Sequence, residues 1–161
     1  MDAHSRPLRT TLIRHEPDPH GPPPHFDWML EPSTEISFDS AITTESRDVL
    51  TWRTQNRPDR LEIGDMLDLE PIENHRRIWL DRDPGLTIEL RPPLGRATIL
   101  RQGRTQGPVT TSDEVLEFDI AWSESDDIHH LRLENRGLRG SRLLRLPLRT
   151  EAPSRDGATP C

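Results

Sequence analysis

The chain has 161 residues, enough for one domain with a real core, but apolar residues make up only 31% of it, which is low for a globular protein. Sixteen prolines and nine glycines therefore predict a modest core with short strands and many polar connections. The net charge of −7 excludes a protein that coats nucleic acid by bulk attraction, and the single cysteine excludes an internal disulfide and a cysteine-based zinc site.

The two ends of the chain differ from its middle. Residues 1–7 lack the apolar core of a signal peptide, and no apolar run approaches the length of a membrane span. We therefore expect a cytoplasmic protein with no membrane segment. Residues 1–7 are predicted to be a disordered arm and residues 150–161 a disordered tail. Between them, residues 8–149 are expected to fold as one domain.

Residues 8–14 are predicted to form the first strand, because the β-branched side chains of Thr10, Thr11 and Ile13 favour the extended state. His15 follows at the end of that strand. The connector that comes next, residues 16–24, is rich in proline and is expected to be a rigid, extended loop. His20 within this loop is either a substitute metal ligand or a solvent-exposed histidine, and the loop setting favours the second interpretation.

Residues 25–31 (HFDWMLE) are predicted to form the second strand, in which successive side chains point to opposite faces. His25, Asp27, Met29 and Glu31 would share one face, and the three apolar residues between them would share the other. With His15 from the neighbouring strand, His25 and Asp27 make the two-histidine, one-carboxylate set that suits a divalent transition metal with open coordination positions. The competing interpretation is the solvated face of an edge strand.

Alternation of apolar and polar residues, bounded by turn signals, predicts further strands along the rest of the chain. These strands are residues 34–39, 49–53, 86–90, 96–101, 115–122, 129–134 and 138–148. Residues 56–65 and 103–112 are predicted to be polar loops. Many short strands and no convincing amphipathic helix indicate an all-β fold, a compact β-barrel or sandwich of short antiparallel strands with long, proline-rich loops.

Three further histidines need an interpretation. Residues 74–81, if extended, place His75, Arg77 and Trp79 on one face of a strand. From the spacing alone, His75 fits a surface turn better than a functional site. His129 and His130 are adjacent, so they would face opposite sides of a strand and are poor joint ligands.

Four short motifs follow one another in order along the chain, between Thr11 and Leu148. They are residues 12–15 (LIRH) with 25–31 (HFDWMLE), residues 49–52 (VLTW), residues 74–81 (NHRRIWLD), and residues 131–133 (LRL) with 138–142 (LRGSR). Together they resemble the 3'-phosphoesterase domain of bacterial DNA ligase D. The chain is similar to a short, free-standing and divergent version of that domain.

The resemblance implies a compact β-barrel with a shallow metal site on its surface. Mn²⁺, or another divalent ion, would be held by His15, His25 and Asp27, and His75, His25 and Asp27 would be the catalytic residues. His75 would donate a hydrogen bond or a proton to a phosphate. The implied substrate is the 3' end of a DNA primer, trimmed of a 3'-phosphate or a terminal ribonucleotide, and the implied partner is a DNA ligase or polymerase of end-joining repair.

Two positions depart from the family pattern. Met29 stands where the family has arginine, and a thioether cannot clamp a phosphate. Trp79 stands where the family has tyrosine, so a hydroxyl is lost. Positive charge could come instead from Arg14, Arg76 or Arg77.

Two alternatives to an active enzyme therefore remain open. One is a catalytically impaired metal-binding module that binds DNA ends or a repair partner. The other is a small structural β-domain whose histidines are incidental. Metal content separates the structural domain from the other two interpretations, and activity on a 3'-phosphate separates the enzyme from the binding module.

Overall fold

The computed structural model describes residues 6–32 and 44–148. Nine strands lie in these segments, together with one helical turn, α1 (Ile78–Asp81), and two 3₁₀ turns, η1 (Pro58–Arg60) and η2 (Gly137–Arg139). The strands are β1 (Arg9–Glu16), β2 (His25–Leu30), β3 (Arg47–Thr54), β4 (Met66–Arg76), β5 (Thr87–Glu89), β6 (Arg96–Ser112), β7 (Val115–Trp122), β8 (Ile128–Asn135) and β9 (Ser141–Leu146).

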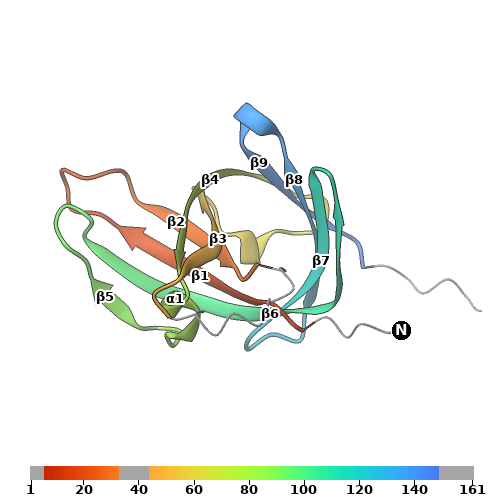
Figure 1. Cartoon of the computed structure of the whole chain (residues 1–161), viewed down its shortest axis with the longest axis horizontal. Coiled ribbons are helices and arrows are strands. Elements are labelled where there is room, and N and C mark those ends of the chain that lie inside the picture. The colour runs from red at the N-terminus through yellow and green to blue at the C-terminus, as the bar shows by residue number, and fades with distance from the viewer. Residues whose placement is uncertain (1–5, 33–43, 149–161) are drawn as a thin grey trace, which may run out of the picture.

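Eight of these strands form a closed antiparallel barrel. The strand order is β1-β2-β3-β4-β9-β8-β7-β6, and pairing of β1 with β6 closes the ring. Strand β5 pairs only with the first residues of β6, outside the ring (Figure 1). The all-β barrel predicted from alternation is therefore confirmed. Closure leaves the ring without a free edge, which removes a common site of aggregation.

The interior of the barrel is filled by one face of each strand, as alternation along a strand requires. Trp28 lies between two aromatic rings there, with ring centroids 5.1 Å from Trp52 and 6.3 Å from Phe118. The Trp28 indole N–H donates to the Thr10 hydroxyl (2.7 Å), which donates in turn to the Met29 carbonyl (2.7 Å). These bonds tie β1 to β2 under the outer face of the barrel.

A second, smaller apolar cluster lies on the outer face of β1, β2, β3 and β6, where α1 and β5 cover it. Its buried members are Ile13, Met29, Val49, Leu80, Ala97 and Ile99. On β2, Trp28 and Leu30 belong to the barrel interior whereas Met29 belongs to this outer cluster. The predicted division of β2 into two faces is therefore confirmed, and both faces are covered.

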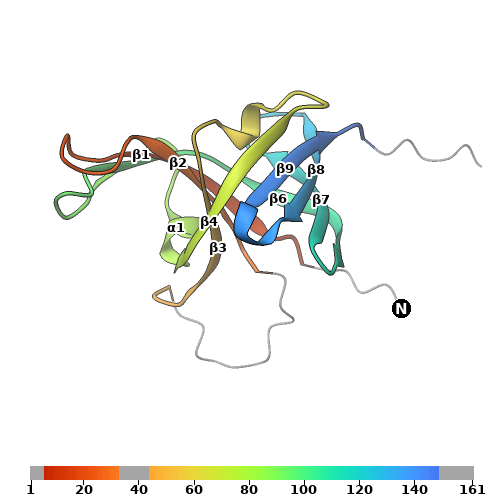
Figure 2. The same ribbon diagram turned by 90° about the horizontal axis from the view of Figure 1, so that it is seen from above.

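The connector between β1 and β2 and the loop between β5 and β6 extend together beyond the barrel (Figures 1 and 2). The Asp18 amide donates to the Pro93 carbonyl at 3.1 Å. Gly95 has φ +71°, and a Cβ there would overlap the Glu16 carbonyl oxygen and lie 2.7 Å from Pro17 Cα. Only glycine therefore lets the two loops lie this close together.

The prediction that residues 103–112 form a loop is wrong, because they continue β6 as its pairing partner changes from β1 to β7. Gly103, at the start of this segment, allows β6 and β7 to pack closely. A Cβ at Gly103 would lie 2.7 Å from the Ala121 carbonyl oxygen on β7. Pairing with a neighbouring strand thus overrides the weak β-propensity of this polar segment.

The prediction of an extended segment at residues 74–81 is wrong in its second half. Strand β4 ends at Arg76. Arg77 has helical dihedrals (φ −59°, ψ −23°) at the start of α1. The Arg77 guanidinium binds the Asp48 carboxylate at 2.7 Å, and Leu80 enters the outer cluster. Burial of this one turn decides the conformation, so the predicted strand face shared by His75 and Arg77 does not form.

The last strand, predicted for residues 138–148, begins at Ser141, after η2 and the positive φ (+80°) of Gly140. The predicted strand at residues 34–39 lies outside the described residues, as do the tail and most of the predicted N-terminal arm. Across residues 6–32 and 44–148, no helix has both the length and the apolar character needed to cross a membrane.

Candidate metal centre

His15, His25 and Asp27 come together on the outer face of the barrel, beside the outer cluster. The antiparallel register of β1 and β2 places His15 directly opposite His25, and Asp27 follows on the same face of β2. The three residues are 8%, 3% and 5% exposed. Their ligand atoms all lie within 4.8 Å of one another, and no other such group of metal-ligand residues is found in the described part of the chain. The triad predicted from the sequence is therefore assembled.

The two histidine rings turn one nitrogen each towards the other. His15 Nδ1 lies 2.9 Å from His25 Nε2, with the rings nearly perpendicular (82°). The outer nitrogens bind backbone carbonyls, His15 Nε2 that of Leu94 at 2.5 Å and His25 Nδ1 that of Pro23 at 2.9 Å. A carbonyl only accepts, so each neutral ring uses its one N–H there. Two lone pairs then face each other across 2.9 Å.

A positive charge between the rings would relieve this contact, and a metal ion held by the triad could supply it. Burial lowers the pKa of His25, which disfavours an imidazolium. Histidine ligands of metals commonly donate their outer N–H to a backbone carbonyl, which fixes the tautomer and the ring orientation. Both histidines carry this second support.

Two of the three ligand separations are close to those around a common ion. Ligand atoms with bonds of about 2.1 Å are roughly 3.0 Å apart at an octahedral edge and 3.4 Å apart at a tetrahedral edge. The His15 to His25 nitrogen separation is 2.9 Å, and His25 Nε2 lies 3.6 Å from Asp27 Oδ1. The donor set of two imidazoles and one carboxylate suits a divalent transition metal. All three ligand atoms lie within 4.8 Å of one another, so the residues present could hold a metal ion.

His75 adds a third imidazole at the edge of this site. It stands near the end of β4, opposite Val49 of β3, and its side chain is 26% exposed. Its Nδ1 binds the Glu73 carbonyl at 3.0 Å, and Nε2 lies 3.9 Å from Asp27 Oδ2. Burial is the main cause that lowers the pKa of His75. Because Nδ1 holds the proton in the neutral ring, Nε2 accepts a proton first and donates only afterwards.

Arg53 is a site residue that sequence reasoning missed. It lies directly opposite Asp27 in the register of β2 and β3, and its Nε donates to Asp27 Oδ1 at 3.3 Å. Alternation along β3 would have placed Arg53 on the outer face. Its partner could not be foreseen, because the register between two strands joined by a long connection cannot be read from the sequence.

The three arginines considered as substitutes for the missing positive charge are bound elsewhere. Arg14 pairs with Glu16 (2.9 Å), and Arg76 pairs with Glu45 (3.1 Å). Arg77 pairs with Asp48 and, at 3.4 Å, with the buried Glu31.

The two residues that depart from the family pattern serve as apolar packing. Met29 is fully buried in the outer cluster, two residues along β2 from Asp27. Trp79 packs against the same cluster, and the Arg82 guanidinium lies 4.2 Å from its ring centroid. Neither side chain offers a charged or hydroxyl group to the site.

The other three histidines of residues 6–32 and 44–148 lie away from the triad. His20 is exposed in the connector and is not part of the group of ligands. His130 faces outward from β8 and binds the Asp119 carboxylate at 2.6 Å. His129 is buried on β8, with no hydrogen-bond partner for its Nδ1 among the described residues. The solvent-exposed interpretation of His20 therefore fits the structure.

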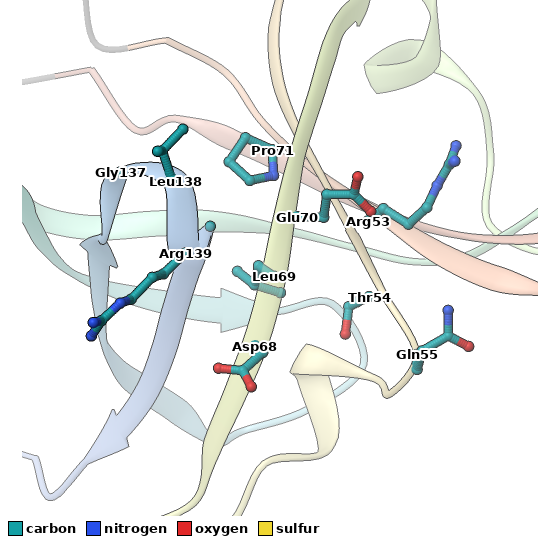
Figure 3. Close-up of a pocket in the computed structure, with 11 residues that line it drawn as sticks. Arg53, Thr54, Gln55, Asp68, Leu69, Glu70, Pro71, Gly137, Leu138 and Arg139 are labelled. Carbon is teal, nitrogen blue, oxygen red and sulfur yellow. The ribbon is translucent and has the colours of Figure 1, made fainter.

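An open groove of about 630 Å³ adjoins Arg53. It lies along β4, with η2 on one side and the end of β3 on the other (Figure 3). The close-up shows Leu138 and Arg139 on the far side of β4 from Arg53, whose guanidinium points away from them. The stem of Arg53 thus borders the groove while its Nε binds Asp27 on the metal side.

Comparisons with protein-family models, with curated proteins and with solved structures gave no match for this chain.

Proposed function

We propose that this protein is a metal-dependent 3'-phosphoesterase that removes a 3'-phosphate or a 3'-terminal ribonucleotide from the end of a DNA primer. The observation that carries the proposal is the pair of facing imidazole nitrogens, each fixed by a backbone carbonyl, beside a buried carboxylate. His15, His25 and Asp27 would hold the ion, and Mn²⁺ is the candidate that the resemblance to the ligase D domain implies. A DNA ligase or polymerase would use the trimmed end.

Different residues of this chain would hold the ion and transfer the proton. A divalent ion, when bound, supplies Lewis-acid polarisation of a phosphoryl oxygen and neutralises developing charge. His75 lies at the exposed edge, where its free Nε2 would take a proton from the attacking water. The water oxygen would bond to phosphorus as the bond from phosphorus to the 3'-oxygen breaks. The proton held by His75 would return to that oxygen, which leaves a 3'-hydroxyl and inorganic phosphate. Asp27 connects the metal ligands to His75, because its Oδ1 lies near His25 and its Oδ2 lies near His75.

A second candidate function is a metal-binding module that binds DNA ends or a repair partner without hydrolysis. The observation that favours it is the burial of Met29 in the outer cluster, because this position then presents no group that could clamp a phosphate.

The test is a trimming assay on a primer-template that carries either a 3'-phosphate or one 3'-ribonucleotide, with and without Mn²⁺. Asp27→Ala removes a ligand, and Asp68→Ala is the matched control, since Asp68 also faces a cross-strand arginine but lies away from the histidines. We expect trimming and metal binding by the wild type and by Asp68→Ala, and neither by Asp27→Ala. Retained activity and metal affinity in Asp27→Ala would exclude the proposed centre, and tight metal binding without trimming would establish the binding module.

A further inference from the structure

The guanidinium of Arg53 is only partly used by the protein. Its Nε makes the single contact with Asp27 at 3.3 Å, and the side chain is 33% exposed. Within residues 6–32 and 44–148, neither terminal Nη group has a hydrogen-bond partner. Arg77, by contrast, uses all of its guanidinium nitrogens for hydrogen bonds within the protein. It is 11% exposed, and all three of its nitrogens bind Asp48 or Glu31.

The free end of Arg53 is placed for an anion. A guanidinium presents its Nη groups as a planar fork that matches two oxygens of a phosphate. The bond to Asp27 fixes the plane of that fork beside a metal-ligand carboxylate. An oxyanion bound there would lie beside Asp27, and therefore near both the candidate metal position and His75.

The local charge also favours an anion at this place. Arg47 and Arg53 both lie close enough to His75 to act on its charge, and Arg47 is exposed. Two arginines from the last part of the described chain lie elsewhere. Arg136 and Arg142 are near Asp68, on the part of β4 away from His75. Positive charge at the triad is therefore local, as an acidic protein that binds only a strand end requires.

We propose that Arg53 is the oxyanion-binding residue of the site, and that its two Nη groups hold the phosphate of a nucleic-acid 3' end beside the metal ligands. The identity of the substrate rests on the function proposed above, but binding of an oxyanion does not require turnover.

The test measures binding of inorganic phosphate to the Mn²⁺-loaded protein by calorimetry. Arg53→Gln removes the charge and the fork, and Arg53→Lys keeps the charge alone. Arg142→Gln is the matched control, because Arg142 faces Asp68 across β4 and β9, its Nε lies 3.5 Å from that carboxylate, and its side chain is 30% exposed. We expect Arg53→Gln to weaken phosphate binding at least about tenfold, Arg53→Lys to be intermediate, and Arg142→Gln to match the wild type.

Metal affinity, measured on the same variants, separates anion binding from positioning of Asp27. We expect Mn²⁺ affinity in Arg53→Gln to stay close to that of the wild type. Wild-type phosphate affinity in Arg53→Gln, or a parallel loss of Mn²⁺ and phosphate, would overturn the inference. Absence of phosphate binding by the loaded wild type would overturn it as well. Arg53-dependent phosphate binding without trimming would refute only the proposed reaction, whereas trimming that ignores Arg53→Gln would refute only the role of Arg53.

Discussion

Gly95→Ala should weaken metal binding although Gly95 touches no ligand. Gly95 lies next to Leu94, whose carbonyl holds the outer nitrogen of His15. A Cβ at Gly95 would overlap the Glu16 carbonyl oxygen and lie 2.7 Å from Pro17 Cα. Backbone atoms cannot rotate away, so the loop between β5 and β6 must move and take the Leu94 carbonyl with it.

The size of the effect follows from two separate costs. Alanine at a positive φ costs about 1–2 kcal/mol of stability, and Gly85 offers the same backbone strain in isolation, because its φ is +87° and nothing lies within 4 Å of its added Cβ. Loss of the hydrogen-bond partner behind a ligand histidine typically reduces metal affinity about 10–100-fold. Gly95→Ala should show both costs, and Gly85→Ala only the first.

The assay is Mn²⁺ affinity by competition with a chelator, together with the free energy of unfolding of the metal-free proteins in urea. We expect Gly85→Ala to bind Mn²⁺ as the wild type does, and Gly95→Ala to bind it about 10–100-fold more weakly. Equal Mn²⁺ affinities in the two variants would refute the claim that the Leu94 carbonyl orients His15.

Two further predictions concern stability, measured as the free energy of unfolding in urea. Thr10→Val leaves the buried Trp28 N–H without its acceptor and should cost about 1–3 kcal/mol. Thr11→Val should cost little, since the buried Thr11 hydroxyl has no partner among the described residues; equal losses would contradict this reasoning. Burial, with nearby arginine charges, lowers the pKa of His129 below its ordinary 6.5. Below pH 6.5 the imidazole is therefore protonated in the unfolded chain before it is protonated in the native chain. Stability should therefore fall on acidification, by up to about 1.4 kcal/mol per pH unit for this group. His129→Leu should reduce that slope between pH 7.5 and 5.5, whereas the exposed His20→Gln should not.

The fold class and the grouping of His15, His25 and Asp27 could be predicted from the sequence for the same reason. Alternation along β2 divides His25 and Asp27 from Trp28 without reference to any other segment. His15 lies near enough in the chain to pair with His25 across one connection. Properties set by period and by neighbouring segments could therefore be predicted.

What the sequence did not reveal depends on distant pairing. Arg53 faces Asp27 only because β3 takes one register against β2. Residues 103–112 are a strand only because β7 pairs with them. The turn α1 forms where Arg77 finds the Asp48 carboxylate. In each case the conformation depends on a partner from another part of the chain, and local propensity cannot predict which residue that partner is.

Closure of the ring by β1 and β6 sets an order of events during synthesis on the ribosome. Strands β1 and β2 are neighbours in the chain and can pair early, whereas β1 must wait for β6 before the barrel closes. The triad of His15, His25 and Asp27 belongs wholly to the early hairpin, and the Leu94 carbonyl arrives only with the late loop. A nascent chain thus contains all three candidate ligands before the barrel closes, and an ion captured at that stage would stabilise the hairpin until β6 pairs with it.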